Sequence, residues 1–122
     1  MDLENIVSVF CKLSGALSSE RSSFIDIVTY SYYYISNRLI KEDDEYTDEE
    51  ISELEYATAC VAFYSYNTVV YSRESRYLSD NGKYISGSEN DLRIKSAELM
   101  MNLALKNVRH LLIDDDFLFV NV

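Results

Sequence analysis

The sequence predicts a mostly α-helical fold, namely a bundle of about four helices with a small β-hairpin between the last two helices and an extended C-terminal tail. Two observations carry this prediction. The chain has no proline and only three glycines among its 122 residues, so the strongest helix breakers are almost missing. Hydrophobic residues also recur at intervals of three and four, which is the period of a helix with one buried face. The length suits one helical domain, residues 1–122, with a modest core.

Two amphipathic helices are predicted in the first third of the chain. Residues 1–18 place hydrophobic side chains on one helical face, and acidic residues near the start suit the positive end of a helix. Residues 19–40 form the second predicted helix, with a hydrophobic stripe from Phe24 to Leu39. The tyrosines at 30 and 32–34 would also suit a β-strand. The stripe runs through them without a turn residue, so we interpret this segment as helical.

The next segment, residues 41–47, is predicted to be an acidic linker, because four acids follow one another at 42–45. The four residues from Thr47 to Glu50 then match a capping box. In that motif the Thr47 hydroxyl accepts a hydrogen bond from the Glu50 backbone, and the Glu50 carboxylate accepts one from the Thr47 backbone. The third helix is therefore predicted over residues 48–75.

This third helix is hydrophobic on nearly every side between Tyr56 and Tyr71. A helix that is apolar all round is buried all round, and a short chain has few other elements to surround it. We therefore expect it to contact neighbouring subunits. The eleven tyrosines fit this idea, since tyrosine is enriched at interfaces, although a place at the edge of the core is equally open. The candidate interface residues are Tyr56, Phe63, Tyr64, Tyr66, Tyr71, Asn81, Gly82, Lys83, Phe117 and Phe119.

The last third is predicted to contain a hairpin, a helix and a tail. The pair Asn81-Gly82 favours a tight turn, which places a hairpin at 77–87. The fourth helix is predicted over 88–113, with three acids following it at 114–116, where negative charge opposes the helix dipole. Two lines of side chains run along this helix. The first is Leu92, Ser96, Leu99, Leu103 and Lys106, and the second is Leu105, Val108 and Leu112. The tail, 114–122, ends in six mainly apolar residues, which either pack on this domain or add a strand to a neighbour.

The sequence indicates no enzymatic chemistry. His110 is the one histidine, and no serine, cysteine or acid has a spacing that would make it part of a catalytic group. Cys11 and Cys60 lie inside hydrophobic helical patterns and are expected to be reduced and buried. The acidic run at 42–50 lacks the alternating oxygen ligands and glycine of a calcium loop. We therefore predict a protein that is not an enzyme, with no metal and no cofactor.

The net charge of −10, from 21 acidic and 11 basic residues, limits the classes of partner. Such a charge repels phosphate backbones and disfavours non-specific binding of nucleic acid. It permits a basic protein partner or a role as an acidic surface lining. Acidic residues near the N-terminus argue against a secretory signal, and the longest uncharged stretch, 56–72, is too polar for a membrane span. A cytosolic protein without membrane contact is expected.

Residues 51–122 resemble the head–tail connector proteins, also called adaptor or head-completion proteins, of tailed bacteriophages and prophages. Four features carry the resemblance in sequence order. They are the helix with ATACVAFYSY at 57–66, the short polar hairpin at 77–88 ending in Ser-Gly-Ser, the helix at 92–112 and the acidic-aromatic ending DDDFLF at 114–119. Residues 1–50 match that family only as generic helices.

The resemblance implies a non-enzymatic helical subunit of the virion neck, made in the cytoplasm of the bacterial host. Such subunits assemble into a homo-oligomeric ring below the portal, extend the DNA channel and dock the tail or a stopper protein. DNA would pass through without specific binding, which suits the negative charge. A different hypothesis remains open, in which the chain is a small acidic helical regulator that binds a basic protein partner.

Overall fold

The computed structural model describes the backbone of residues 1–80 and 87–113, and the side chains of residues 1–71 and 89–113. Four main helices pack together, which confirms the mostly α-helical prediction. They are α1 (Leu3–Ser14), α2 (Ile25–Ser36), α3 (Asp48–Asp80) and α4 (Gly87–Val108). Three short 3-10 helices join them, namely η1 (Ser18–Ser23), η2 (Asp43–Glu45) and η3 (Arg109–Leu111). The described part of the chain contains no β-strand beyond an isolated bridge between Leu39 and Leu112.

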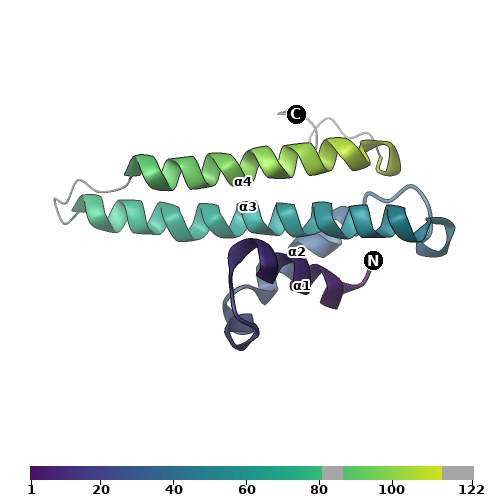
Figure 1. Ribbon diagram of the computed structural model, residues 1–122, viewed down its shortest axis with the longest axis horizontal. Coiled ribbons are helices and arrows are strands. Elements are labelled where there is room, and N and C mark those ends of the chain that lie inside the picture. The colour runs from purple at the N-terminus through teal and green to yellow at the C-terminus, as the bar shows by residue number, and fades with distance from the viewer. Residues whose placement is uncertain (81–86, 114–122) are drawn as a thin grey trace.

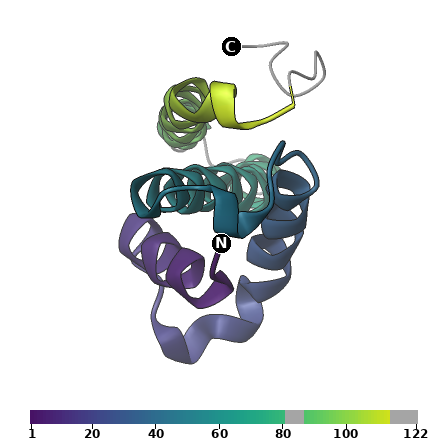
Figure 2. The same ribbon diagram turned by 90° about the vertical axis from the view of Figure 1, so that its right-hand side faces the viewer.

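The helices form three layers, and α3 is the middle one. Figure 1 shows α3 and α4 side by side and antiparallel along the long axis, with α1 and α2 beneath α3. The end view in Figure 2 shows α4 above, α3 in the middle, and α1 and α2 beside each other below. The end of the α3–α4 pair at which α3 finishes and α4 begins projects beyond α1 and α2, and we call it the projecting end (Figure 1). Helix α3 is therefore the central element on which the other three pack.

This central position explains why α3 is apolar on nearly every side. On one side Ala59 and Ala62 pack with residues of α1 and α2, such as Phe10 and Val28. On the other side Ala57 and Cys60 belong to a second cluster. These four small side chains are fully buried by helices of the same chain. Over residues 57–62, helices of the same chain therefore cover α3 without a neighbouring subunit, whereas Tyr56 and Val69 remain 42% and 40% exposed.

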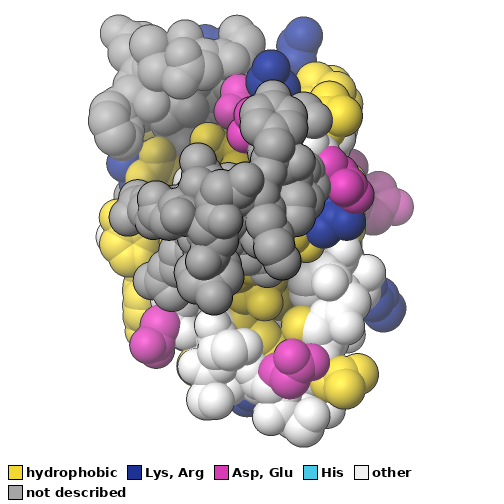
Figure 3. Space-filling view, turned by 90° about the vertical axis from the view of Figure 1, so that its left-hand side faces the viewer, with side chains coloured by type: hydrophobic (Ala, Val, Ile, Leu, Met, Phe, Trp, Pro, Cys, Tyr) yellow, Lys and Arg dark blue, Asp and Glu magenta, His cyan; other side chains and the backbone are white. Residues whose placement is uncertain are grey.

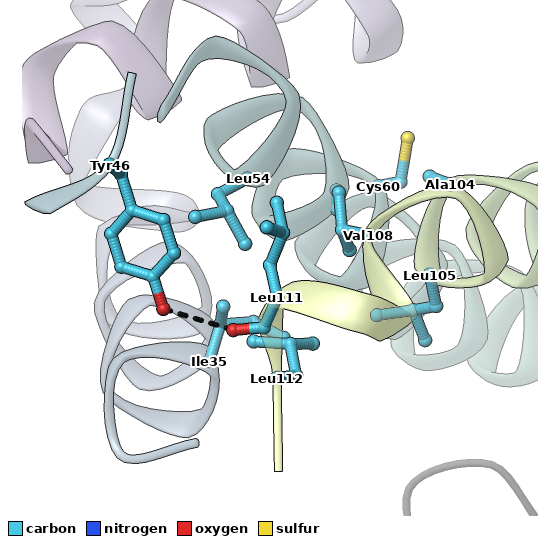
Figure 4. Packing of buried hydrophobic residues seen from close by; sticks show 10 residues of the cluster. Ile35, Tyr46, Leu54, Cys60, Ala104, Leu105, Val108, Leu111 and Leu112 are labelled. Atoms are coloured by element: carbon cyan, nitrogen blue, oxygen red, sulfur yellow. Dashed lines mark hydrogen bonds between the residues drawn. The ribbon is translucent and has the colours of Figure 1, made fainter. Parts of the chain in front are cut away.

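The second cluster joins α3 to α2, α4 and the end of η3, and Figure 4 shows its packing. A polar anchor of this cluster is Tyr46, which is 7% exposed. The Tyr46 hydroxyl donates a hydrogen bond to the carbonyl oxygen of Leu111 at 3.0 Å. It also accepts hydrogen bonds from the backbone N–H groups of Ile40 and Lys41, each at 3.1 Å. One side chain therefore ties the linker before α3 to the end of the α4–η3 segment.

The start of α3 is the boundary that the sequence predicted best. The Thr47 N–H donates to the Glu50 carboxylate at 2.9 Å, and the Glu50 N–H donates to the Thr47 hydroxyl at 3.1 Å. The reciprocal pair confirms the capping box and the start of the helix at Asp48. The hydrogen bond from the Thr47 N–H lowers the pKa of the Glu50 carboxyl below its usual value.

The first two helices are shorter than predicted. Helix α1 ends at Ser14 instead of residue 18, because Gly15 adopts a left-handed conformation with φ of 75° and its N–H caps the Cys11 carbonyl. The prediction of one helix over 19–40 is also wrong, since η1 precedes α2 and a turn follows it. In η1 the Ser23 hydroxyl donates to the Glu20 carbonyl at 2.7 Å. Such local serine contacts compete with α-helical geometry.

The last two helices also differ from the prediction at their ends. Helix α3 continues to Asp80 instead of ending at residue 75. Residues 77–80 are therefore helical, and the prediction that they form the first strand of the 77–87 hairpin is wrong. No strong breaker precedes the Asn81-Gly82 pair, which explains the extra turn. The rest of that hairpin, 81–86, and the predicted tail, 114–122, lie outside the described residues. Helix α4 ends at Val108, because η3 and the bridge between Leu39 and Leu112 replace its last predicted turn.

Candidate interaction surfaces

The outer face of α4 carries three exposed leucines, which we call the leucine line: Leu92, Leu99 and Leu103. Their exposed fractions are 64%, 62% and 56%. Their spacing of seven and four residues puts them on one side of the helix. The opposite side of α4 is buried, with Leu105 at 3% and Val108 at 1% exposed. Helix α4 thus has one apolar face against α3 and a second apolar face open to solvent.

Charged residues flank the leucine line. Lys95 and Lys106 are exposed and lie within one helical turn of Leu99 and Leu103 respectively. Arg93 pairs with Glu89 at 3.2 Å, and its guanidinium lies 5.0 Å from the centre of the Tyr71 ring. By contrast, residues 42–55 hold nine acidic residues and no basic one. The molecule therefore presents an apolar surface with charged residues of both signs on α4, which also carries Glu89, Asp91 and Glu98, and a strongly acidic surface around the start of α3.

A second candidate surface is a groove between α2, α3 and α4, which we call the tyrosine groove. Its walls include Tyr30 and Tyr34 from α2, Val61 and Tyr64 from α3, and Met101 and Leu105 from α4. The hollow has a volume of about 220 Å³. Tyr30 is 74% exposed at its rim, while the neighbouring Tyr33, at 58%, points to solvent outside the groove. Aromatic walls around a small hollow suit an apolar side chain from another segment.

A third candidate surface is a hollow of about 480 Å³, which we call the third hollow. It lies on the other edge of the α3–α4 seam and is lined by α1, α3 and α4. It brings together Phe63, Tyr66 and Tyr71 of the candidate interface residues. Tyr66 meets the ring of Phe10 edge to face, with the ring centres 5.5 Å apart. Phe63 and Tyr66 are half-buried against the core, so they belong to its edge as well as to this surface. Hydrophobic side chains reach the surface on both flanks of the projecting end, among charged ones (Figure 3).

The exposed Tyr56 and His110 lie elsewhere, in a hollow of about 570 Å³ that also includes Glu53 and Asn107. The Tyr56 pKa is raised by a hydrogen bond with Cys60. Burial raises the pKa of the Cys60 thiol to about 11, so the thiol is almost entirely protonated at neutral pH. Both cysteines are free. Cys60 is buried, as predicted, whereas Cys11 is only partly buried.

The candidate interface residues thus fall into separate places. Tyr56 lies in the His110 hollow, Tyr64 in the tyrosine groove, and Phe63, Tyr66 and Tyr71 in the third hollow. The other five candidates, Asn81, Gly82, Lys83, Phe117 and Phe119, lie outside the described residues. Sequence reasoning did not select the leucine line as a surface, although the line was visible as one of two apolar lines on the fourth helix. The sequence contains no signal that tells which of the two lines packs against α3.

Among the described side chains, those of residues 1–71 and 89–113, no group of three or more His, Cys, Asp or Glu is placed to hold a metal ion. Nor does any helix in this part of the chain have the length and apolar content needed to cross a membrane. Comparisons with protein-family models, with curated proteins and with solved structures found no match to this chain. The function is therefore inferred from the surfaces and from the sequence resemblance.

Proposed function

We propose that this protein is a structural subunit of a phage head–tail connector, which assembles into a ring below the portal, extends the DNA channel and docks the tail or a stopper. The observation that carries the proposal is the leucine line on the outer face of α4. Covering a leucine that is about 60% exposed contributes on the order of 1 kcal/mol. Three of them on one helix form a surface suited to a protein contact.

A ring also needs a second, different face, because its contacts join unlike surfaces of successive copies. The lower layer supplies a candidate on α2, where Tyr30 and Tyr33 are 74% and 58% exposed. These tyrosines and the leucine line belong to opposite outer layers of the fold (Figure 2). An arrangement with apolar patches on two outer layers supports repeated contacts between copies.

The charge distribution suits passage of DNA without binding. Nine acidic residues at 42–55 give a strongly negative surface around the start of α3. A channel wall of this kind repels phosphates, so DNA slides without adhering. In this proposal the acidic surface faces the channel, and the subunit works in the virion neck after synthesis in the host cytoplasm.

The same acidic stretch favours one other candidate function. In this alternative the protein is a small helical regulator, and residues 42–55 bind a basic protein partner. Long-range attraction between opposite charges would speed such an encounter, and salt would weaken it. The leucine line would then have no part in the principal contact.

Copurification with the portal protein of the same phage or prophage tests the two candidates. Light scattering and electron microscopy would measure assembly for the parent protein, for the double variant Leu99→Ser, Leu103→Ser, and for Leu17→Ser. Leu17 is 64% exposed on the connection after α1, so it is a matched control. The connector proposal expects rings with the portal for the parent and for Leu17→Ser, and their loss in the double variant.

A parent protein that stays monomeric and does not bind the portal contradicts the connector proposal. Salt-sensitive capture of a basic protein, lost when acids at 42–50 are changed to their amides, would support the regulator instead. Rings that survive in the double variant would show that the leucine line is not the contact.

A further inference from the structure

The last described residues of the chain are anchored beside the C-terminal end of α2. Leu112 forms an antiparallel bridge with Leu39, and the Ile113 N–H donates to the Arg38 carbonyl at 2.8 Å. Ile113 therefore lies beside Arg38, in the turn that follows α2.

The tyrosine groove begins near this anchor. Tyr34 lies four residues before Arg38, whose guanidinium is 3.9 Å from the centre of the Tyr34 ring, and Tyr30 is a further helical turn back. The hollow of about 220 Å³ is smaller than the roughly 300 Å³ at which pockets for small organic ligands begin. One or two side chains of a peptide segment match it better than a cofactor does.

The residues that follow Ile113 have the matching length and chemistry. Three aspartates come first, and Phe117-Leu118-Phe119-Val120 comes next. Four extended residues from Ile113 to Phe117 span about 13 Å, while the eight residues from Arg38 back to Tyr30, most of them in α2, span about 12 Å. The first aromatic residue can therefore reach the groove. The aspartates would pass the end of α2, where the Arg38 guanidinium lies 3.9 Å from the centre of the Tyr34 ring.

We propose that the tyrosine groove is the docking site for residues 117–120 of the same chain. In an extended segment Phe117 and Phe119 share one face, so both can turn towards the tyrosines. The same chain is the favoured source, because its short tether gives a high effective concentration at the groove. This inference does not depend on the proposed function. It leaves the leucine line on α4 open for a partner, and on α2 it leaves Tyr33 instead of Tyr30 for a neighbouring copy.

A single tryptophan reports on this docking, because the natural chain contains none. The variant Phe119→Trp is expected to show blue-shifted emission and several-fold weaker quenching by acrylamide than tryptophan in water. Adding Tyr30→Glu at the groove rim should remove the blue shift and restore quenching, because it places a charge beside an apolar segment. Adding Tyr33→Glu is the matched control and should change neither. Both tyrosines are well exposed, so both variants keep the fold, which circular dichroism would verify.

Three outcomes overturn the proposal. The first is water-like emission from Phe119→Trp in the otherwise unchanged chain. The second is protected emission that Tyr30→Glu does not alter, which places the segment elsewhere. The third is protection that disappears on dilution, which assigns the docked segment to a second copy. Protection that is independent of concentration and lost only in the Tyr30→Glu variant supports docking within one chain.

Discussion

Helix α4 carries leucines on both of its faces, and the two faces have opposite surroundings. Leu105 is 3% exposed against α3, whereas Leu99, less than two turns away, is 62% exposed. The packed face also contains Ala97 and Ala104, and α3 contributes Ala57 to the cluster that Ala104 joins. Small residues on both helices let their backbones approach closely. The difference teaches that hydrophobic spacing predicts a helix, while close-packing small residues decide which face turns inward.

Truncating one leucine on each face gives the largest expected contrast. Leu105→Ala removes buried methyl groups and leaves a cavity, so it should lower the free energy of unfolding by about 2–4 kcal/mol. Leu99→Ala, the same chemical change on the open face, should alter it by less than about 0.5 kcal/mol. Urea unfolding of both variants measures the two values. Equal losses would show that the open face is covered within the monomer.

The reactivity of the Cys60 thiol is a second measurement that distinguishes Leu105→Ala from Leu99→Ala. It is buried in the cluster that contains Leu105, and its pKa is raised to about 11. Labelling in the parent protein should therefore be slow at neutral pH and faster for the partly buried Cys11. Leu105→Ala should speed the labelling of Cys60, because α4 separates from α3 more often, whereas Leu99→Ala should not.

The hydrogen bonds of Tyr46 test how firmly the end of the packed face is held. Tyr46→Phe keeps the ring but removes partners from the Leu111 carbonyl and from the N–H groups of Ile40 and Lys41. We expect a loss of about 2 kcal/mol, because unsatisfied polar groups are left at a mostly buried site. Thermal unfolding measures it, with the exposed Tyr33→Phe as the control. If Tyr46→Phe speeds hydrogen exchange at Leu112 and Ile113 more than it does in α1, the effect is located at the end of η3.

A smaller effect is expected where α3, the partner of the packed face, begins. Thr47→Ala removes the cap and should cost about 1 kcal/mol, whereas Thr47→Ser should restore it. The folded-state pKa of Glu50 is lowered, so its contribution is present above its unfolded pKa and is lost as the pH falls through the folded value. Acid titration should therefore shrink the stability difference between the parent and Glu50→Ala, which lacks the carboxylate, whereas Thr47→Ala keeps the backbone N–H that binds Glu50. A difference that stays constant in acid would contradict this role of Glu50.

The smallest effect on stability is expected for the open face itself. Leu99→Ser, Leu103→Ser should leave the unfolding free energy within about 0.5 kcal/mol of the parent, because these side chains are already largely in water. Its effect should appear in assembly with a partner instead. Comparing chemical unfolding with light scattering separates the two properties. A double variant that unfolds easily would show that the leucine line serves the core and not a partner.

Local sequence signals determined much of this protein. The absence of proline and the recurrence of hydrophobic residues predicted four main helices, and the pattern from Thr47 to Glu50 predicted the start of α3. These features depend on neighbouring residues, which is why the sequence reveals them. The ends of helices were predicted less well. Gly15 stopped α1 early, and the pairing of Leu39 with Leu112 replaced the last predicted turn of α4.

Only the tertiary structure decided which apolar surfaces are covered. The sequence showed that α3 is apolar on nearly every side between Tyr56 and Tyr71, but could not show that α1, α2 and α4 bury its small residues at 57–62 within one chain. It showed two apolar lines on α4 but could not tell that Leu105 would be buried and Leu99 exposed. Burial depends on contacts between residues far apart in the chain, and periodicity carries no record of them. The connector proposal therefore rests on the sequence resemblance and on a line of leucines on α4 whose exposure was decided only by the packing of the helices.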